Sequence, residues 1–295
     1  MVFRELAVLS IREGKILRVD VTDGHVSTIY DRAGPTPDGV VLVDDTLYWT
    51  TMGAPTFDPA RPSSSDPLFS GADGGLHAVR LDGTGARDLL DRGVITTGKQ
   101  LAYQGLLYWG DREGCRVSRA RTDGSELTDL VVNDPDDTGT QECVGVAVDS
   151  EHLYWTQKGP AKGGLGRILR AGLDLLPGET AAHRGDIETL WDRLPEPIDL
   201  ELHGPYLYWT DRGAEPRGNT LNRAPIPRPG EQPAEPEILA GGFTETIGLA
   251  VDDDVAYVSD LGGRLTAVPL PESAGGPPRV IAELGQRLSG IAGIG

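Results

Sequence analysis

Short apolar runs separated by turn residues alternate along the whole chain, which is a pattern typical of β-strands. The clearest run is Leu-Tyr-Trp-Thr-Asp at 207–211. It follows an apolar run and a tight turn, and a Gly-rich loop leads from it to the next strand. Copies of this run recur at 47–50, 107–111, 153–156 and, in a weaker form, 256–260. A recurring set of short strands predicts a repeat fold whose unit is a small antiparallel sheet.

The spacing and the two ends of the chain predict a closed ring. The tyrosines of the five copies stand at 48, 108, 154, 208 and 257, a spacing of about 50 residues that is typical of propeller blades. The chain opens at 7–30 with strands that lack an inner partner, and it closes at 288–294 with an apolar run that lacks a blade. We therefore predict an all-β fold and one domain over residues 1–295. It is a six-bladed β-propeller of four-stranded antiparallel blades, closed by pairing the C-terminal strand with the N-terminal strands.

The composition narrows the function classes. With 27 basic and 45 acidic residues, the chain carries a formal net charge of −18, which repels nucleic-acid phosphates and anionic lipid. We expect neither nucleic acid nor membrane as a partner. Two cysteines, Cys115 and Cys143, indicate no disulfide framework, and we interpret them as small apolar fillers. Residues 1–5 carry charge where a signal peptide has its apolar core, so we expect a cytoplasmic protein.

The repeated Tyr-Trp-Thr-Asp runs, together with Ile-Gly-Leu-Ala-Val-Asp at 247–252, resemble the YWTD repeats of the low-density-lipoprotein receptor family. The resemblance covers essentially the whole chain. It implies a six-bladed propeller in which the motif is structural and the faces bind partner proteins. The chain differs from the receptors because Thr51, Gln157 and Ile11 replace the motif aspartate, and because no Cys-rich module accompanies the repeats.

Long loops between the second and third strands predict a binding rim on one face, where the inner strands also begin. These loops include residues 51–75, 157–166 and 212–220. Three of the four lysines, Lys99, Lys158 and Lys162, are expected on this face, which suits an anionic or carbonyl-bearing ligand. A ligand site on the loop-rich face, at the central channel, is therefore our first hypothesis.

One inner strand interrupts the repeat. The inner strands carry small residues, Gly145 and Ala147 for example, but Asp199 and Glu201 take these places in the strand before Tyr208. Two carboxyl groups near one axis raise each other's affinity for protons, as an acid/base pair requires. We predict Asp199 and Glu201 as catalytic residues, with Lys99 facing them and Gln100 binding the ligand; a hydrated channel with a charge pair is the alternative.

Further charged residues stand where the inner strands begin or where the long loops leave the second strands. We predict ligand-binding roles for Glu142, Lys158, Arg212, Glu245 and Arg287. Several acids at one mouth would also suit calcium, as in lactonase-like propellers, whereas no asparagine is expected at an inner-strand position.

Three functions remain open. The first is a small-molecule site with non-redox chemistry of the lyase or cyclase type and no cofactor. The second is a non-catalytic scaffold that binds a protein or peptide, and the third is a calcium-dependent, lactonase-like hydrolase. A Ser–His–Asp hydrolase is disfavoured, because only His77 is expected near the loop-rich face.

Overall fold

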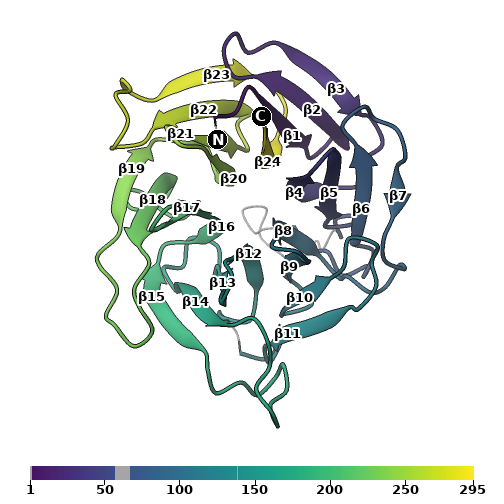
Figure 1. Cartoon of the computed structure of the whole chain (residues 1–295), viewed down its shortest axis with the longest axis vertical. Coiled ribbons are helices and arrows are strands. Elements are labelled where there is room, and N and C mark those ends of the chain that lie inside the picture. The colour runs from purple at the N-terminus through teal and green to yellow at the C-terminus, as the bar shows by residue number, and fades with distance from the viewer. Residues whose placement is uncertain (1, 57–66, 138) are drawn as a thin grey trace.

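The computed structural model describes residues 2–56, 67–137 and 139–295, so 57–66 of the long loop at 51–75 lie outside the described residues. Six four-stranded antiparallel sheets surround a central axis, as Figure 1 shows. The six-bladed propeller predicted from the repeats is therefore confirmed. The described part of the chain contains no helix that is long and apolar enough to span a membrane.

We number the blades I to VI. Blade I contains β24 (Leu288–Ile294), β1 (Glu5–Ser10), β2 (Lys15–Asp20) and β3 (Val26–Tyr30). Blade II contains β4 (Pro37–Val43), β5 (Thr46–Thr51), β6 (Gly75–Arg80) and β7 (Arg87–Asp88). Blade III contains β8 (Gly98–Tyr103), β9 (Leu107–Asp111), β10 (Arg116–Ala120) and β11 (Thr128–Val132). Blade IV contains β12 (Cys143–Val148), β13 (His152–Gln157), β14 (Gly166–Gly172) and β15 (Glu188–Leu194). Blade V contains β16 (Pro197–His203), β17 (Tyr206–Asp211), β18 (Thr220–Pro225) and β19 (Glu237–Gly241). Blade VI contains β20 (Thr246–Val251), β21 (Val255–Asp260), β22 (Arg264–Pro269) and β23 (Arg279–Glu283).

Blade I closes the ring with strands from both ends of the chain. β24 pairs antiparallel with β1, and Ala7 lies opposite Ala292. Both termini accordingly lie beside this blade in Figure 1. Pairing the last strand with the first removes two sheet edges that would otherwise be open to other chains.

The motif aromatics fill the wedges between neighbouring blades. Each interblade cluster joins residues of two blades; Tyr108 of β9, for example, packs in one cluster with Trp155 of β13. Tyr154 of β13 shares the next cluster with Trp209 of β17. These large side chains are almost fully buried, as a structural motif requires.

The motif threonine links each blade to the next. Thr210 Oγ1 accepts the backbone N–H of Asp199 in its own blade at 3.1 Å and donates to the carbonyl of Ile247 in the next at 2.7 Å. The same arrangement recurs at Thr50, Thr156 and Ser259. In blade III, Gly110 occupies the motif position, and a Cβ there would stand 2.6 Å from the carbonyl oxygen of Val144. Blades III and IV therefore approach too closely for a side chain.

The motif aspartate ties the start of the inner strand to the loop after the second strand. Asp211 accepts the backbone N–H groups of Glu196 and Gly213. Burial raises the pKa of Asp211 to about 7, although these two hydrogen bonds oppose the shift. Asp111 and Asp260 make equivalent bonds. The aspartate acts as a structural cap, as the resemblance implies.

Candidate functional site

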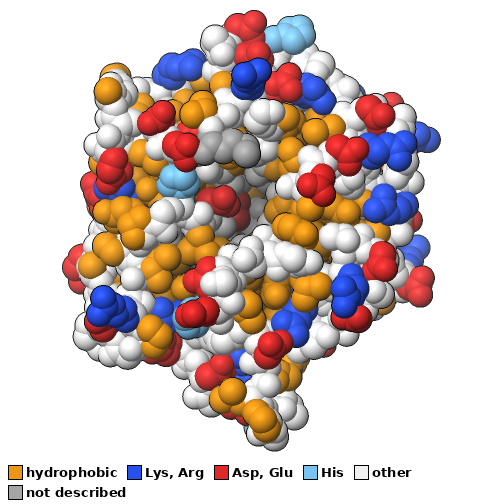
Figure 2. Space-filling view, viewed as in Figure 1, with side chains coloured by type: hydrophobic (Ala, Val, Ile, Leu, Met, Phe, Trp, Pro, Cys, Tyr) orange, Lys and Arg blue, Asp and Glu red, His pale blue; other side chains and the backbone are white. Residues whose placement is uncertain are grey.

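A cavity of about 740 Å³ lies in the central channel. Its wall is formed by the later residues of the inner strands and is mainly aliphatic; Asp44, Asp199 and Glu201 are the acidic side chains among the described residues that line it. Because Asp44, Tyr103 and Gly295 also line it, the cavity reaches the face where first and second strands are joined. Figure 2 shows the molecule hollowed at its centre, with hydrophobic side chains around the opening.

The cavity is closed toward the loop-rich face by one layer of residues from the beginnings of the inner strands, which we call the floor. The floor consists of Asp38, Lys99, Val144, Ile198, Ile247 and Ser289, all of them buried. Val144, Ile198 and Ile247 come from three different blades and pack together. Ser289 Oγ donates to the carbonyl of Pro37 at 2.7 Å. The cavity therefore opens on the face opposite to the one on which we expected the ligand site.

Asp199 and Glu201 lie together in the cavity wall, as predicted. Pairing of Glu201 with Tyr208 and of Ala147 with Tyr154 confirms the alignment that singled out Glu201. Burial raises the pKa of Glu201 to about 8. Burial and the charge of Glu201 raise the pKa of Asp199 well above its ordinary value, although the backbone N–H groups of Leu249 and Leu200 bond to its oxygens at 2.9 Å. Their catalytic role stays a prediction.

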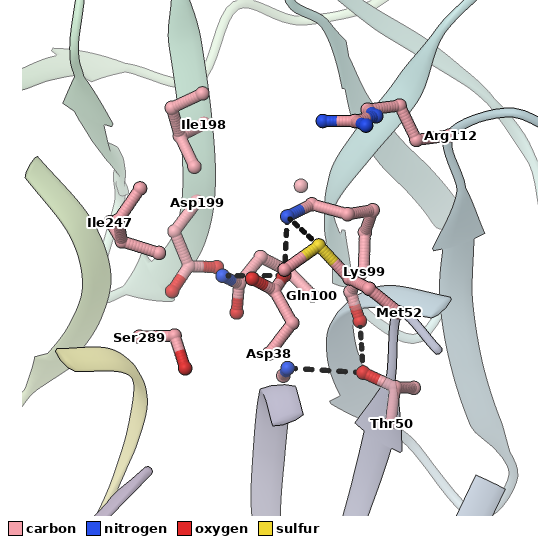
Figure 3. A network of polar contacts seen from close by, with 12 residues as sticks. Asp38, Thr50, Met52, Lys99, Gln100, Arg112, Ile198, Asp199, Ile247 and Ser289 are labelled. Atoms are coloured by element: carbon pink, nitrogen blue, oxygen red, sulfur yellow. Dashed lines mark hydrogen bonds and ion pairs between the residues drawn. The ribbon is translucent and has the colours of Figure 1, made fainter. Parts of the chain in front are cut away.

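Lys99 does not pair with these acids. Its Nζ lies 2.8 Å from Oδ2 of Asp38 and 3.3 Å from Sδ of Met52, within the floor. Burial lowers the pKa of Lys99, and the Asp38 carboxylate opposes this shift. Gln100, which lines the cavity, donates to the same oxygen of Asp38 at 3.4 Å. Figure 3 shows Asp38 between Lys99 and Gln100, so Lys99 is linked to the cavity through Asp38.

Sequence reasoning missed Asp38. The register places it one residue before Gly39, as Lys99 stands one residue before Gln100, and a β-bulge in both strands shifts the residues that follow. The available signal was a charged residue at equivalent positions of two consecutive inner strands.

On the loop-rich side of the floor, acids and bases alternate in a chain of ion pairs. Glu196 is fully buried and is bound by Arg212 Nε at 3.0 Å, with Lys158 Nζ at 3.7 Å. Lys158 Nζ also lies 2.9 Å from Glu142, and Lys162 Nζ lies 2.7 Å from Glu245. Arg212 Nε lies 3.8 Å from Glu245. Four predicted ligand-binding residues, Glu142, Lys158, Arg212 and Glu245, are thus brought together. Arg287 is exposed at the start of β24.

The thiols and His77 lie in settings that do not activate a nucleophile. Burial raises the pKa of Cys115 to about 11 and raises that of Cys143 further. His77 Nδ1 bonds to Asp88 at 2.7 Å and Nε2 to Thr51, but Thr51 is buried. None of the four lines the central cavity.

No protein-family model matches the chain. A protein of Pyricularia oryzae (strain 70-15) named Low-density lipoprotein receptor-related protein 1 is 38% identical over 308 residues, a match that covers 96% of this chain and 93% of that protein. The chain belongs to this YWTD-type family. LAM1 of Cochliobolus heterostrophus, named a 3-hydroxyacyl-CoA dehydrogenase-like protein, is 36% identical over 288 residues. That match covers 90% of this chain, which spans 58% of the length of LAM1.

Solved propellers share the fold of this YWTD-type chain. One in a crystal structure of a nidogen/laminin complex has a TM-score of 0.71 at 17% identity, and 98% of this chain and 97% of that chain are covered. A gluconolactonase of Xanthomonas campestris has a TM-score of 0.61 at 15% identity, with 96% and 87% covered. At such identities the likeness shows the fold alone.

The lactonase-like hypothesis would place calcium at the mouth, so we compared the acids there with what calcium needs. A hard cation requires several carboxylate or carbonyl oxygens directed at one point. Instead, Glu142, Glu196 and Glu245 direct oxygens at Lys158, Arg212 and Lys162. Among the described residues, no group of three His, Cys, Asp or Glu side chains is arranged to hold a metal ion. The acids of this YWTD-type mouth do not fit calcium.

Proposed function

We propose that this protein binds a small, uncharged, mainly aliphatic molecule with an oxygen acceptor in its central cavity, and that Asp199 and Glu201 perform non-redox acid/base chemistry on it. The observation that carries the proposal is the pairing of two buried carboxyl groups inside an otherwise aliphatic cavity of about 740 Å³. Cavities of this size and character are typical of small-molecule sites.

Aliphatic walls and raised pKa values support an uncharged ligand. Leu42, Leu200 and Leu202 offer apolar surface to an alkyl or acyl chain. An anionic ligand would meet the charge of the pair without a cation in the cavity wall, since Lys99 lies in the floor, bound to Asp38. A carbonyl or hydroxyl oxygen, in contrast, accepts a hydrogen bond from a protonated carboxyl group.

The pair suits elimination or ring closure. With a hydroxylated acyl substrate, Glu201 would donate its proton to the leaving hydroxyl while the Asp199 carboxylate takes a proton from carbon, and water and a double bond form. The name of LAM1 refers to 3-hydroxyacyl compounds, which belong to this chemical class. Each proton transfer is balanced within the pair, so the reaction needs no redox cofactor.

Calorimetric titration with matched probes tests the proposal. We expect 2-nonanone and δ-nonalactone to bind at neutral pH, and nonanoate to bind at least about tenfold more weakly, a difference of about 1.4 kcal/mol. Glu201→Gln and Asp199→Asn should weaken binding of the lactone. Glu283→Gln, at the end of the outer strand β23, is the control and should not change it.

Equal affinity for nonanoate and the lactone would refute the uncharged-ligand proposal. No binding of either neutral probe to a folded protein would refute the cavity site and leave the protein-binding scaffold as the better function. For catalysis, mass spectrometry should detect loss of water from a 3-hydroxyacyl thioester. Unchanged turnover in Asp199→Asn with Glu201→Gln would refute the acid/base role.

A further inference from the structure

The motif tryptophans differ in what covers them. Trp49 packs against Tyr30 of β3, with ring centroids 5.8 Å apart, and Trp209 packs against Trp191 of β15 at 5.4 Å. In both pairs the second ring comes from the outermost strand of the preceding blade. Trp109 follows blade II, whose outermost strand β7 is only two residues long, Arg87–Asp88, and supplies no aromatic ring.

A cavity of about 140 Å³ lies beside Trp109. Its lining residues come from blade III and the segment before it: Val94, Trp109, Arg116, Ser118, Leu127 and Asp129. An apolar protein cavity of about 150 Å³ is large enough to hold benzene. The space beside Trp109 therefore has room for one six-membered ring, where other blades provide a ring of their own.

The indole of Trp109 also lacks a hydrogen-bond acceptor. Its Nε1 is buried and has no partner among the described residues. In contrast, Trp49 Nε1 donates to the carbonyl of Ala33 and Trp191 Nε1 to that of Ala234, each at 2.9 Å. A buried N–H without an acceptor costs about 1–3 kcal/mol. A ligand atom that accepts this hydrogen bond would recover that free energy.

The polar groups at the cavity are already balanced in charge. Arg116 Nη2 bonds to Asp111 at 3.0 Å, and its Nη1 lies 3.6 Å from Asp129. Ser118 Oγ donates to Asp129 at 2.6 Å. A charged ligand would therefore find no uncompensated partner here, whereas a neutral ring finds an apolar wall and one indole donor.

We propose that this cavity is a second binding site, separate from the central cavity, for a small neutral aromatic ring that carries a hydrogen-bond acceptor. The ring takes the place that Tyr30 and Trp191 occupy beside their tryptophans. The acceptor, a ring nitrogen for example, receives the N–H of Trp109.

NMR of ¹⁵N-indole-labelled protein tests the site with pyridine and benzene as probes at neutral pH. The Trp109 resonance is assigned by its loss in Trp109→Phe. We expect pyridine to shift it saturably and downfield, and benzene to shift it less. Trp155 is the matched control within the protein, because its Nε1 also lacks a partner in the described chain but does not line the cavity.

A variant that fills the cavity separates binding from nonspecific effects. Val94→Phe places a ring in the space and should abolish the pyridine shift while the other indole resonances keep their positions. A shift that does not saturate, an equal shift at Trp155, or an undiminished shift in Val94→Phe would each overturn the proposal. A response to benzene equal to that to pyridine would overturn the role of the indole donor.

Discussion

Glu201 is the residue whose chemistry departs furthest from that of its equivalents. Where the other motif blades carry Val41, Ala102, Ala147 or Ala250 opposite the motif tyrosine, Glu201 places a carboxyl group in an aliphatic wall. A charged group in such a wall opposes folding unless it is protonated. A residue with this cost and no structural partner is better explained by function than by stability.

Stability should therefore depend on pH through Glu201. Because its pKa is raised to about 8, the folded protein binds this proton while the unfolded chain releases it, so stability falls as pH rises from about 4.5 to 8. Glu201→Gln removes this loss. We expect the variant to be more stable than the parent by about 2 kcal/mol at pH 8 and to match it at pH 4.

Urea unfolding at both pH values measures this difference. About half of the full shift is expected, since the side chain keeps some exposure to water. A constant difference between the two proteins across this range would contradict the assignment of the raised pKa to Glu201.

Thr210 illustrates a residue whose role is purely structural. Thr210→Val keeps the shape but removes one acceptor and one donor between blades V and VI. We expect a loss of about 2–3 kcal/mol in unfolding free energy, because the N–H of Asp199 and the carbonyl of Ile247 lose a buried partner. Thr210→Ser, which keeps the hydroxyl, should lose less than about 1 kcal/mol, as judged by chemical denaturation.

At the scale of elements, the sequence predicted strands and blades well because aromatic residues mark each second strand and turn residues separate the runs. It placed the acid pair correctly because the register of β16 follows that of β12 and β20. It did not identify Asp38, because Pro37-Asp38-Gly39 has the composition of a turn although Pro37–Val43 is an inner strand. It also could not show that Lys99 binds Asp38 rather than Asp199, since β-bulges decide which residues face each other.

The junction between blades III and IV shows that a motif residue is not always an improvement. Gly110→Thr would restore the motif, but its Cβ would meet the carbonyl oxygens of Val144 and Cys143 at 2.6 and 2.8 Å. We expect a loss of about 1–3 kcal/mol from overpacking. Gly276→Thr is the control, because nothing lies within 4 Å of a Cβ at that glycine. Equal melting temperatures of the two variants would contradict the close approach of the blades.

At the scale of the whole molecule, the ring depends on its last strand. Removing residues 288–295 deletes β24 and exposes the paired edge of β1. We expect this truncated chain to lose its single cooperative thermal transition and to aggregate. A circular permutant that joins Gly295 to Val2 through a flexible linker and opens at Gly34 keeps all 24 strands and should fold. Calorimetry and size-exclusion chromatography compare the two, and a monomeric, cooperatively unfolding truncation would refute this dependence.

The closed floor of the central cavity also constrains how ligands exchange. Since Val144, Ile198 and Ile247 pack together across the channel, arrival and departure share a single doorway. A newcomer cannot push the occupant out from behind, so the occupant has to leave first. Displacement in a stopped-flow experiment should then follow the dissociation rate of the first ligand and stay independent of the concentration of the second. A substrate longer than the cavity would keep its far end outside, available to whatever enzyme made it.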